Sequence, residues 1–299
     1  MSLFKNDRGQ ATVLTVLSLT ALLGMAALVL DVGSWFRAQR DTQAAADASA
    51  LAAAQALPYS PGAASALAGE YVDKNGGGAR TITFASKNLA NDTVSVTVER
   101  PTPGFFAKVF GVNSVQVGAK ATARTGTLAE ARFAAPIGVD KRHPLLSGSG
   151  CPCFGQDTDL ELEKVGPGAF RFLNLDGSHG GTGTQDIEAW ITSGFDGYMP
   201  LGWYGSNPGA KTSSNVTSAM NVKIGDELLF PVYDRTVDNG ANFDYEVIGW
   251  VGFLVTDYIK VGGNNKRITG QFVRVIWEGL QSTSGSTISF GAQAIQLVE

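Results

Sequence analysis

The longest stretch without a charged side chain lies close to the N-terminus, over residues 9–30. As a helix, residues 11–30 would rise roughly 30 Å, which is about the thickness of the hydrocarbon layer of a bilayer. A cleaved secretory signal has a shorter apolar core, of about 7–15 residues. The pattern therefore predicts a transmembrane helix over residues 11–30.

Residues 31–57 continue the helical pattern with more polar side chains. From residue 37 onward this stretch is rich in alanine, the strongest helix former, and lacks glycine and proline. A polar stripe is predicted from side chains that recur every four residues, namely Gln39, Gln43 and Asp47. A smooth face open to another helix is predicted from Ala44, Ala48, Leu51 and Ala52. Two interpretations are open: this stalk helix folds back on its own domain, or it packs laterally in a pilus-like bundle.

The next stretch, residues 58–124, predicts a small α+β module. Helical spacing and alternating strand patterns succeed one another there. The pattern gives helices over residues 61–73 and 105–110, and strands over residues 80–85, 93–100 and 114–123. Residues 125–132 are poor in large apolar side chains and are predicted to be a linker.

The remaining residues, 133–299, predict a mostly β domain. Strand-like runs broken by Gly, Asn and Asp clusters occupy residues 226–233, 245–260, 268–277 and 287–298. A sandwich or a barrel is the expected architecture. One helix is predicted in this region, over residues 186–192. The fold class expected for the chain is α+β.

Composition excludes some classes of function. The formal net charge is −4, with 23 basic and 27 acidic residues, so a nucleic-acid partner is not expected. The two histidines, His143 and His179, lie outside any zinc-protease motif, and neither a nucleophile elbow nor a phosphate-binding loop occurs. The sequence therefore predicts a protein that is not an enzyme and takes no cofactor or metal.

Short motifs near the N-terminus follow one another in a fixed order. They are Arg8-Gly9-Gln10-Ala11 before the apolar run, Asp31-x-Gly33 after it, and Arg40-x-x-Gln43-x-Ala45-Ala46-Asp47 further on. This order resembles the N-terminal region of TadE/TadG-like proteins, and more closely of the TadG-like proteins of Flp (tight adherence) pilus assembly. The resemblance implies a non-enzymatic, membrane-anchored component of pilus assembly. Helix packing or partner contact is expected for Asp31, Gly33, Gln43 and Asp47.

The same resemblance guides the expected location and partners. Only residues 1–10 precede the apolar run, so we place them in the cytoplasm and expect a single-pass plasma-membrane protein with its C-terminal domain outside. The positive-inside rule gives almost no bias, because basic residues flank both ends of the run. Expected partners are the membrane, other pilus-assembly or pilin-like proteins, and a second copy of the chain. A pilin-like filament subunit is an alternative.

Two further features suggest local chemistry. Trp203 and Tyr204 lie in a glycine-rich stretch and could form a ligand platform, which favours a second alternative, a membrane-anchored or filament-borne module that binds carbohydrate or a surface ligand. Aromatic residues of β proteins are also common in cores. Cys151 and Cys153 could form a local disulfide, remain as thiols, or bind a metal with His143 nearby.

Overall fold

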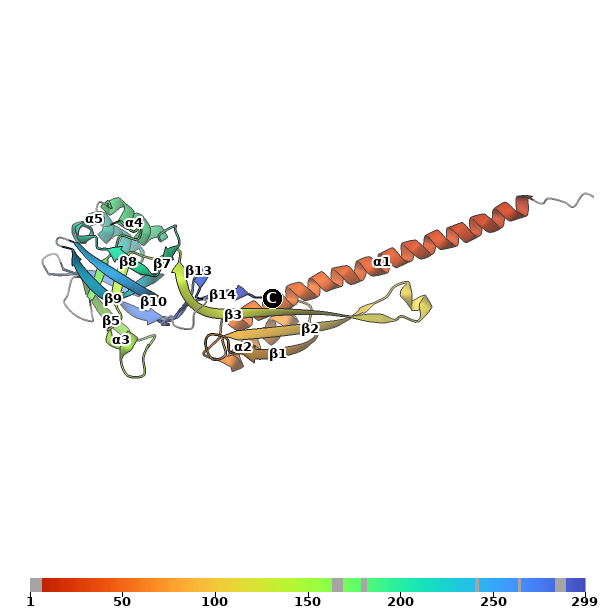
Figure 1. Cartoon of the computed structure of the whole chain (residues 1–299), viewed down its shortest axis with the longest axis horizontal. Coiled ribbons are helices and arrows are strands. Elements are labelled where there is room, and N and C mark those ends of the chain that lie inside the picture. The colour runs from red at the N-terminus through yellow and green to blue at the C-terminus, as the bar shows by residue number, and fades with distance from the viewer. Residues whose placement is uncertain are drawn as a thin grey trace, which may run out of the picture. The chain divides into compact units, whose positions relative to one another are not determined.

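A computed structural model describes residues 7–162, 169–178, 182–239, 242–262, 265–282 and 289–298. The chain forms two compact units (Figure 1). The first unit comprises Met1–Ser86, Asn91–Arg124 and Gln296–Glu299, and the second comprises Lys87–Ala90 and Thr125–Ile295. A long N-terminal helix precedes a region built mostly of strands, so the predicted α+β class is confirmed.

The first unit contains one long helix, a shorter helix and three strands. Its elements are α1 (Asp7–Ala54), α2 (Pro61–Lys74), β1 (Ala79–Ala85), β2 (Thr93–Pro103), the short 3₁₀ helix η1 (Ala107–Phe110) and the first part of β3 (Ser114–Ala131). The predicted span and stalk are therefore a single continuous helix. It ends at Ala54 rather than residue 57, because residues 55–57 form the tighter bonds to carbonyls three residues back.

The helix α1 packs against α2 and β2 within this unit. The three strands form an antiparallel sheet in the order β1-β2-β3. Valines at alternate positions of β2 are fully buried, namely Val94, Val96 and Val98. Alternation is expected because successive side chains of a strand point to opposite faces.

The buried face of α1 differs from the predicted smooth face. Ala44 is exposed, and Ala48 and Leu51 are only half-buried. Of the predicted positions, only Ala52 is buried. The other buried positions of this stretch are Thr42, Ala45, Ala46, Ser49, Ala50, Ala53 and Ala54. Nearly every face of this stretch is made of alanine, so hydrophobic periodicity could not distinguish the packed face from the free one.

Residues 125–132 were expected to form a linker, but most of them are part of a strand, because β3 continues through Ala131. Several of these residues, including Thr125 and Leu128, are buried. The paired strand β13 (Gly279–Gln281) packs closely here, because a Cβ added to its Gly279 would lie 2.2 Å from the carbonyl oxygen of Glu130.

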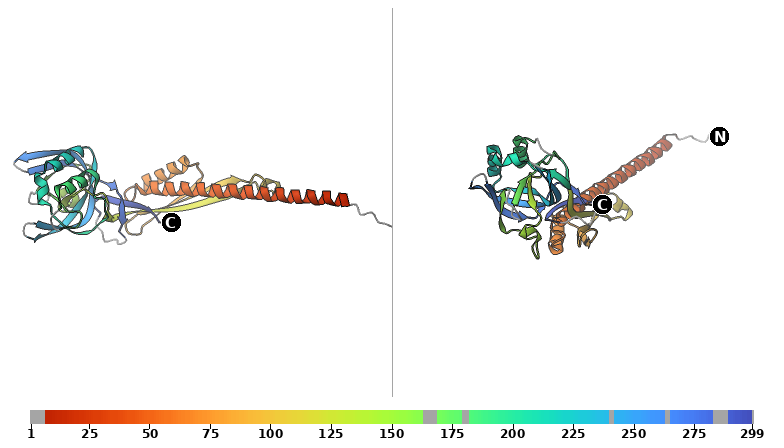
Figure 2. Two further views of the ribbon diagram at one scale, coloured as in Figure 1. Left: turned by 90° about the horizontal axis from the view of Figure 1, so that it is seen from above. Right: turned by 60° about the vertical axis from the view of Figure 1, so that its left-hand side comes forward.

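The second unit is built around a sheet that closes on itself (Figure 2). The sheet has the order β11-β5-β6-β4-β9-β10-β8, and β11 also pairs with β10, which completes a barrel. Its strands are β4 (Ile137–Asp140), β5 (Asp157–Leu162), β6 (Ala169–Phe172), β8 (Gly202–Gly205), β9 (Glu227–Asn239), β10 (Asn242–Gly262) and β11 (Asn265–Val273). Of the two predicted architectures, the barrel is the one observed.

Aromatic side chains fill part of the core of this unit. The rings of Phe230 and Phe253 stack with centroids 5.1 Å apart, and Phe272 meets Phe253 edge-on at 5.1 Å. All three side chains are fully buried. Burial of this kind stabilises a domain by roughly 1.5–3 kcal/mol for each large side chain.

Short strands and helices complete the second unit. The strands are β7 (Met199–Pro200), β12 (Val275–Ile276), β13 (Gly279–Gln281) and the part of β14 (Ala292–Leu297) that ends at Ile295. The helices are α3 (Pro144–Ser147), α4 (Thr184–Ser193), η2 (Pro208–Thr212) and α5 (Ser214–Val222). The predicted helix over residues 186–192 corresponds to α4. Prediction missed α5, whose polar and β-branched residues are weak helix formers and whose Val216 and Met220 are buried in the core.

Candidate functional site

Asp31 is a buried carboxylate at the point where α1 leaves the predicted membrane span. Its side chain is 1% exposed. The Oδ1 atom accepts a hydrogen bond from the backbone N–H of Phe105 at 2.8 Å, and Oδ2 accepts from Phe106 at 3.0 Å and Ala107 at 2.5 Å. These N–H groups lie at the start of η1, where a helix has no internal acceptors for them. Asp31 thus fastens a loop about 75 residues later in the chain to α1.

The environment of Asp31 favours its ionised form. Burial raises the pKa of its carboxyl, but the N–H groups of Ala107, Phe105 and Phe106 and the charge of Lys108 outweigh that effect, and the pKa is lowered. Hydrogen bonds from several backbone N–H groups stabilise a carboxylate in this way. The loop is therefore held by a charged acceptor.

The loop has a second attachment to α1 and is closed at its base. The Trp35 Nε1–H donates to the carbonyl of Pro103 at 3.4 Å. The N–H of Gly104 donates to the carbonyl of Asn113 at 3.1 Å, and Gly111 has a φ of 85°, which favours glycine. Residues 104–113, which we call the η1 loop, are therefore a compact turn. It is tied to α1 through Asp31, and the preceding residue Pro103 is tied to α1 through Trp35.

The predicted polar stripe of α1 contacts the sheet of its own unit. The Gln39 Nε2–H donates to the carbonyl of Gly118 at 2.9 Å. The Gln43 amide donates to the carbonyl of Lys120 at 3.3 Å and to Oδ1 of Asp47 at 2.7 Å. The stripe thus follows β3, and these glutamines are engaged within the chain, as expected for a stalk that folds back on its own domain.

The free surface of α1 in its first turns is apolar. Large apolar side chains between residues 13 and 30 are each more than half exposed. In the part of the chain that the structure describes, α1 is the single helix long and apolar enough to cross a membrane. These properties suit single-pass anchoring.

Most of α1 matches the model of a known protein family. Residues 9–56 match the family described as Putative Flp pilus-assembly TadE/G-like. The resemblance inferred from the N-terminal motifs is confirmed for this region. No curated protein and no solved structure matches the chain.

The TadE/G-like segment contains Asp31, Gly33, Gln43 and Asp47, which the structure places in different roles. Asp31 binds the η1 loop, and Gln43 and Asp47 lie along β3. Gly33 is exposed, and a Cβ added to it would meet no atom within 4 Å. Contact of Gly33 with a partner stays a prediction. The loop partner of Asp31 was missed, because backbone N–H donors leave no signature in a sequence.

The proposed platform of Trp203 and Tyr204 is wrong for Tyr204. The two residues are neighbours on β8, so their side chains point to opposite faces. Tyr204 is 6% exposed and its hydroxyl donates to the carbonyl of Pro200 at 2.7 Å. Trp203 is 41% exposed and lies under the guanidinium of Arg235. A ligand surface built from both rings therefore does not form.

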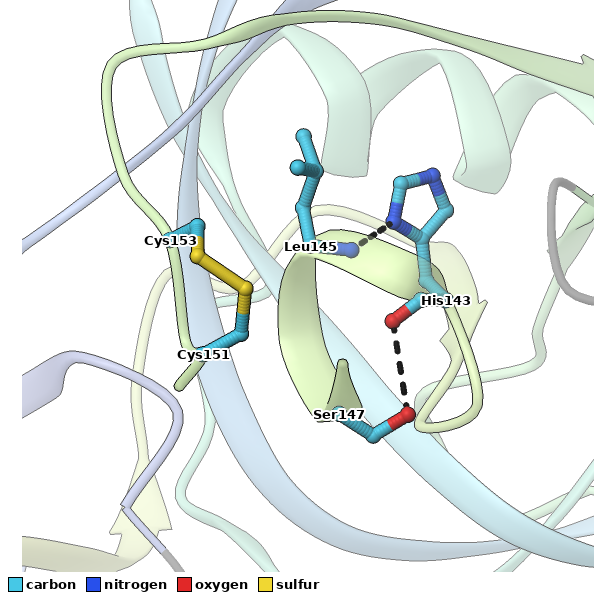
Figure 3. The surroundings of a disulfide bond; sticks show 5 residues. All are labelled: His143, Leu145, Ser147, Cys151 and Cys153. Atoms are coloured by element: carbon cyan, nitrogen blue, oxygen red, sulfur yellow. Dashed lines mark hydrogen bonds between the residues drawn. A yellow bond between two sulfur atoms is a disulfide. The ribbon is translucent and has the colours of Figure 1, made fainter. Parts of the chain in front are cut away.

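Cys151 and Cys153 are joined by a disulfide in the structure. Figure 3 shows this bond beside the single turn of α3, with the imidazole of His143 pointing away from the sulfur atoms. His179 lies outside the described residues. Among the described residues, no group of three His, Cys, Asp or Glu side chains is arranged to hold a metal.

His143 caps α3 in its neutral form. Its Nδ1 accepts from the N–H of Leu145 at 3.2 Å, so the ring proton lies on Nε2 and faces the Thr158 hydroxyl at 3.1 Å. Burial lowers the pKa of His143, and the charge of Asp140 opposes this shift without reversing it. A second ring proton would point at the N–H of Leu145, which explains structurally why the neutral ring is favoured.

We expect the second unit to lose stability as pH falls from about 7.5 to about 5.5. The folded-state pKa of His143 lies below its ordinary value of 6.5, so the unfolded chain takes up the proton first. The stability that depends on the neutral His143 ring is fully present above the unfolded-state pKa. It is lost as pH falls toward the folded-state pKa. One proton limits the slope to about 1.4 kcal/mol per pH unit. Urea unfolding at both pH values measures the loss.

The matched variant for this prediction is His143→Asn. Asparagine also caps helices but does not titrate in this range. The variant should lose less stability than the wild type between the two pH values. An equal loss in both proteins would show that His143 is not responsible.

Proposed function

We propose that the protein is a non-enzymatic, membrane-anchored component of Flp/Tad pilus assembly that presents its β-rich second unit outside the cytoplasm. The observation that carries this proposal is that one helix combines the TadE/G-like match with an exposed apolar surface long enough to cross a bilayer. We place the N-terminus inside, so that the units that follow the span lie outside the cytoplasm.

The contacts of α1 support an anchor that is rigidly joined to the first unit. Asp31 holds the η1 loop, and Gln39 and Gln43 donate to carbonyls of β3. These bonds are spread along α1 after the membrane span. A helix fixed at several points transmits its position to the sheet, whereas a helix on a free linker would not.

A second face of α1 remains available for a partner. Its exposed positions are spaced four, three and four residues apart, which places them on one side of the helix: Gly33, Arg37, Arg40 and Ala44. Small residues at the two ends permit close approach of another helix, and the two arginines suit an acidic neighbour. We propose that other pilus-assembly or pilin-like proteins bind here.

The experiment is deletion of the gene in the source bacterium, followed by complementation. Sheared surface filaments should fall by at least about tenfold on deletion and return with the wild-type chain. The double variant Arg37→Glu/Arg40→Glu should restore the membrane-bound protein but not the filaments. Normal filament yield in the deletion strain would contradict the proposed function.

A further inference from the structure

The η1 loop exposes an unusual concentration of large apolar side chains. The exposed fractions are 64% for Phe105, 45% for Phe106, 82% for Val109, 84% for Phe110 and 42% for Val112. Single exposed apolar residues are common, but five within eight positions form a contiguous segment that needs a partner. The loop is also kept compact by its own hydrogen bonds, so these side chains are presented on a fixed turn.

The position of the loop along α1 indicates what this partner is. Its N–H groups bind Asp31, the residue that directly follows the predicted span over residues 11–30. A helix that crosses the hydrocarbon with residues 11–30 brings residue 31 to the bilayer surface. Hydrogen bonds of 2.5–3.0 Å place the start of the loop at the same level.

The direction of the hairpin agrees with this placement. In Figure 1 the strands β2 and β3, which carry the loop at their tip, run alongside α1 toward its N-terminal end. The tip therefore points toward the membrane span rather than away from it. Next to Asp31 on α1, Trp35 donates to Pro103 and Phe36 is 67% exposed, which adds aromatic side chains at the same level. Aromatic residues are enriched at such interfaces.

We propose that the η1 loop inserts into the outer surface of the bilayer and forms a second membrane anchor beside α1. The apolar side chains of Phe105, Val109 and Phe110 enter the boundary between headgroups and acyl chains. Lys108 is exposed and is the only charged residue of the loop, so its ammonium group remains among anionic headgroups. Two attachments restrain the tilt and rotation of the first unit at the membrane, which a single helix leaves free.

This inference depends on the span over residues 11–30 and is independent of the role in pilus assembly. The occupant is the lipid bilayer rather than another protein, because the loop is continuous with a segment that is already apolar enough to cross the membrane. A partner protein would leave the loop in water when the purified chain is placed in lipid alone.

The test uses the full chain in vesicles of phosphatidylethanolamine and phosphatidylglycerol, with the Cys151–Cys153 disulfide left oxidised. An environment-sensitive fluorophore is attached to Phe110→Cys. We expect blue-shifted emission, quenching by lipids spin-labelled near the carbonyl groups, and protection from aqueous iodide. These three readouts report depth in the bilayer and do not require any activity.

Two matched variants calibrate the result. Tyr59→Cys is also exposed and follows the far end of α1, about 35 Å along the helix from Asp31, so its probe should remain accessible to iodide. Leu17→Cys lies in the middle of the span, so its probe should be quenched by lipid. If the Leu17 probe is buried in lipid while the Phe110 probe behaves like the Tyr59 probe, anchoring by α1 holds and the second anchor is overturned.

Discussion

Replacing Asp31 with alanine will release the η1 loop from α1. The carboxylate accepts three backbone N–H groups that have no other acceptor within η1. Without it, these part-buried donors lose their partner, and the loop opens more often. Lys108 makes the opening measurable, because it provides the single trypsin site in the loop. Cleavage after Lys108 should be at least about tenfold faster than in the wild type, since proteolysis follows the population of the open form.

The controls for this prediction separate the effect of the negative charge of Asp31 from the effect of its oxygen atoms as hydrogen-bond acceptors. Asp47→Ala removes a carboxylate of the same helix that accepts from Gln43 and does not contact the loop, so cleavage after Lys108 should stay at the wild-type rate. Asp31→Asn keeps one oxygen acceptor and loses the charge, so its rate should fall between those of wild type and Asp31→Ala. Equal rates for wild type and Asp31→Ala would mean that the carboxylate does not hold the loop.

Replacing Gly194 with alanine will strongly destabilise the second unit. Gly194 ends α4 with a φ of 77°, and a Cβ there would lie 2.5 Å from both Cα and the carbonyl oxygen of Phe133. The neighbouring Phe195 forms a bridge with Ala134, so neither segment can move away without breaking it. Combining the left-handed backbone strain with overpacking, we expect a loss of roughly 3 kcal/mol or more.

Gly155→Ala is the matched control. Gly155 has a φ of 74°, but a Cβ there would meet no atom within 4 Å, so only the backbone cost of about 1–2 kcal/mol is expected. Urea unfolding followed by tryptophan fluorescence suits both variants, because the second unit contains Trp190, Trp203, Trp250 and Trp277. Similar losses for the two variants would show that the contact with Phe133 is not rigid.

Features encoded by local pattern were predicted well. The apolar run over residues 11–30 and the N-terminal motifs pointed to a membrane helix of a pilus-assembly family, and the family match lies on that helix. Both signals depend only on residues close together in the chain, such as those between Arg8 and Asp47. The second helix, over residues 61–73, was likewise placed nearly correctly by spacing and by Asn75-Gly76 at its end.

Features that depend on distant residues were not predictable. The partner of Asp31 is a set of backbone N–H groups, which any residue except proline supplies. Closure of the barrel depends on the pairing of β10 with β11, and the pattern of each strand is compatible with a sandwich too. Tyr204 was assigned to the surface because the register of β8 cannot be read from its few residues. The predictions that the chain is not an enzyme and takes no cofactor stay predictions.

We propose that the protein acts in pilus assembly from the membrane and is not part of the filament. The most direct measurement is the intact mass and N-terminal sequence of the protein from isolated membranes and, separately, from sheared surface filaments. We expect a chain that retains its apolar span and is found in the membrane fraction. A chain that begins at Gln10 and is enriched in filaments would contradict this role and identify a pilin-like subunit.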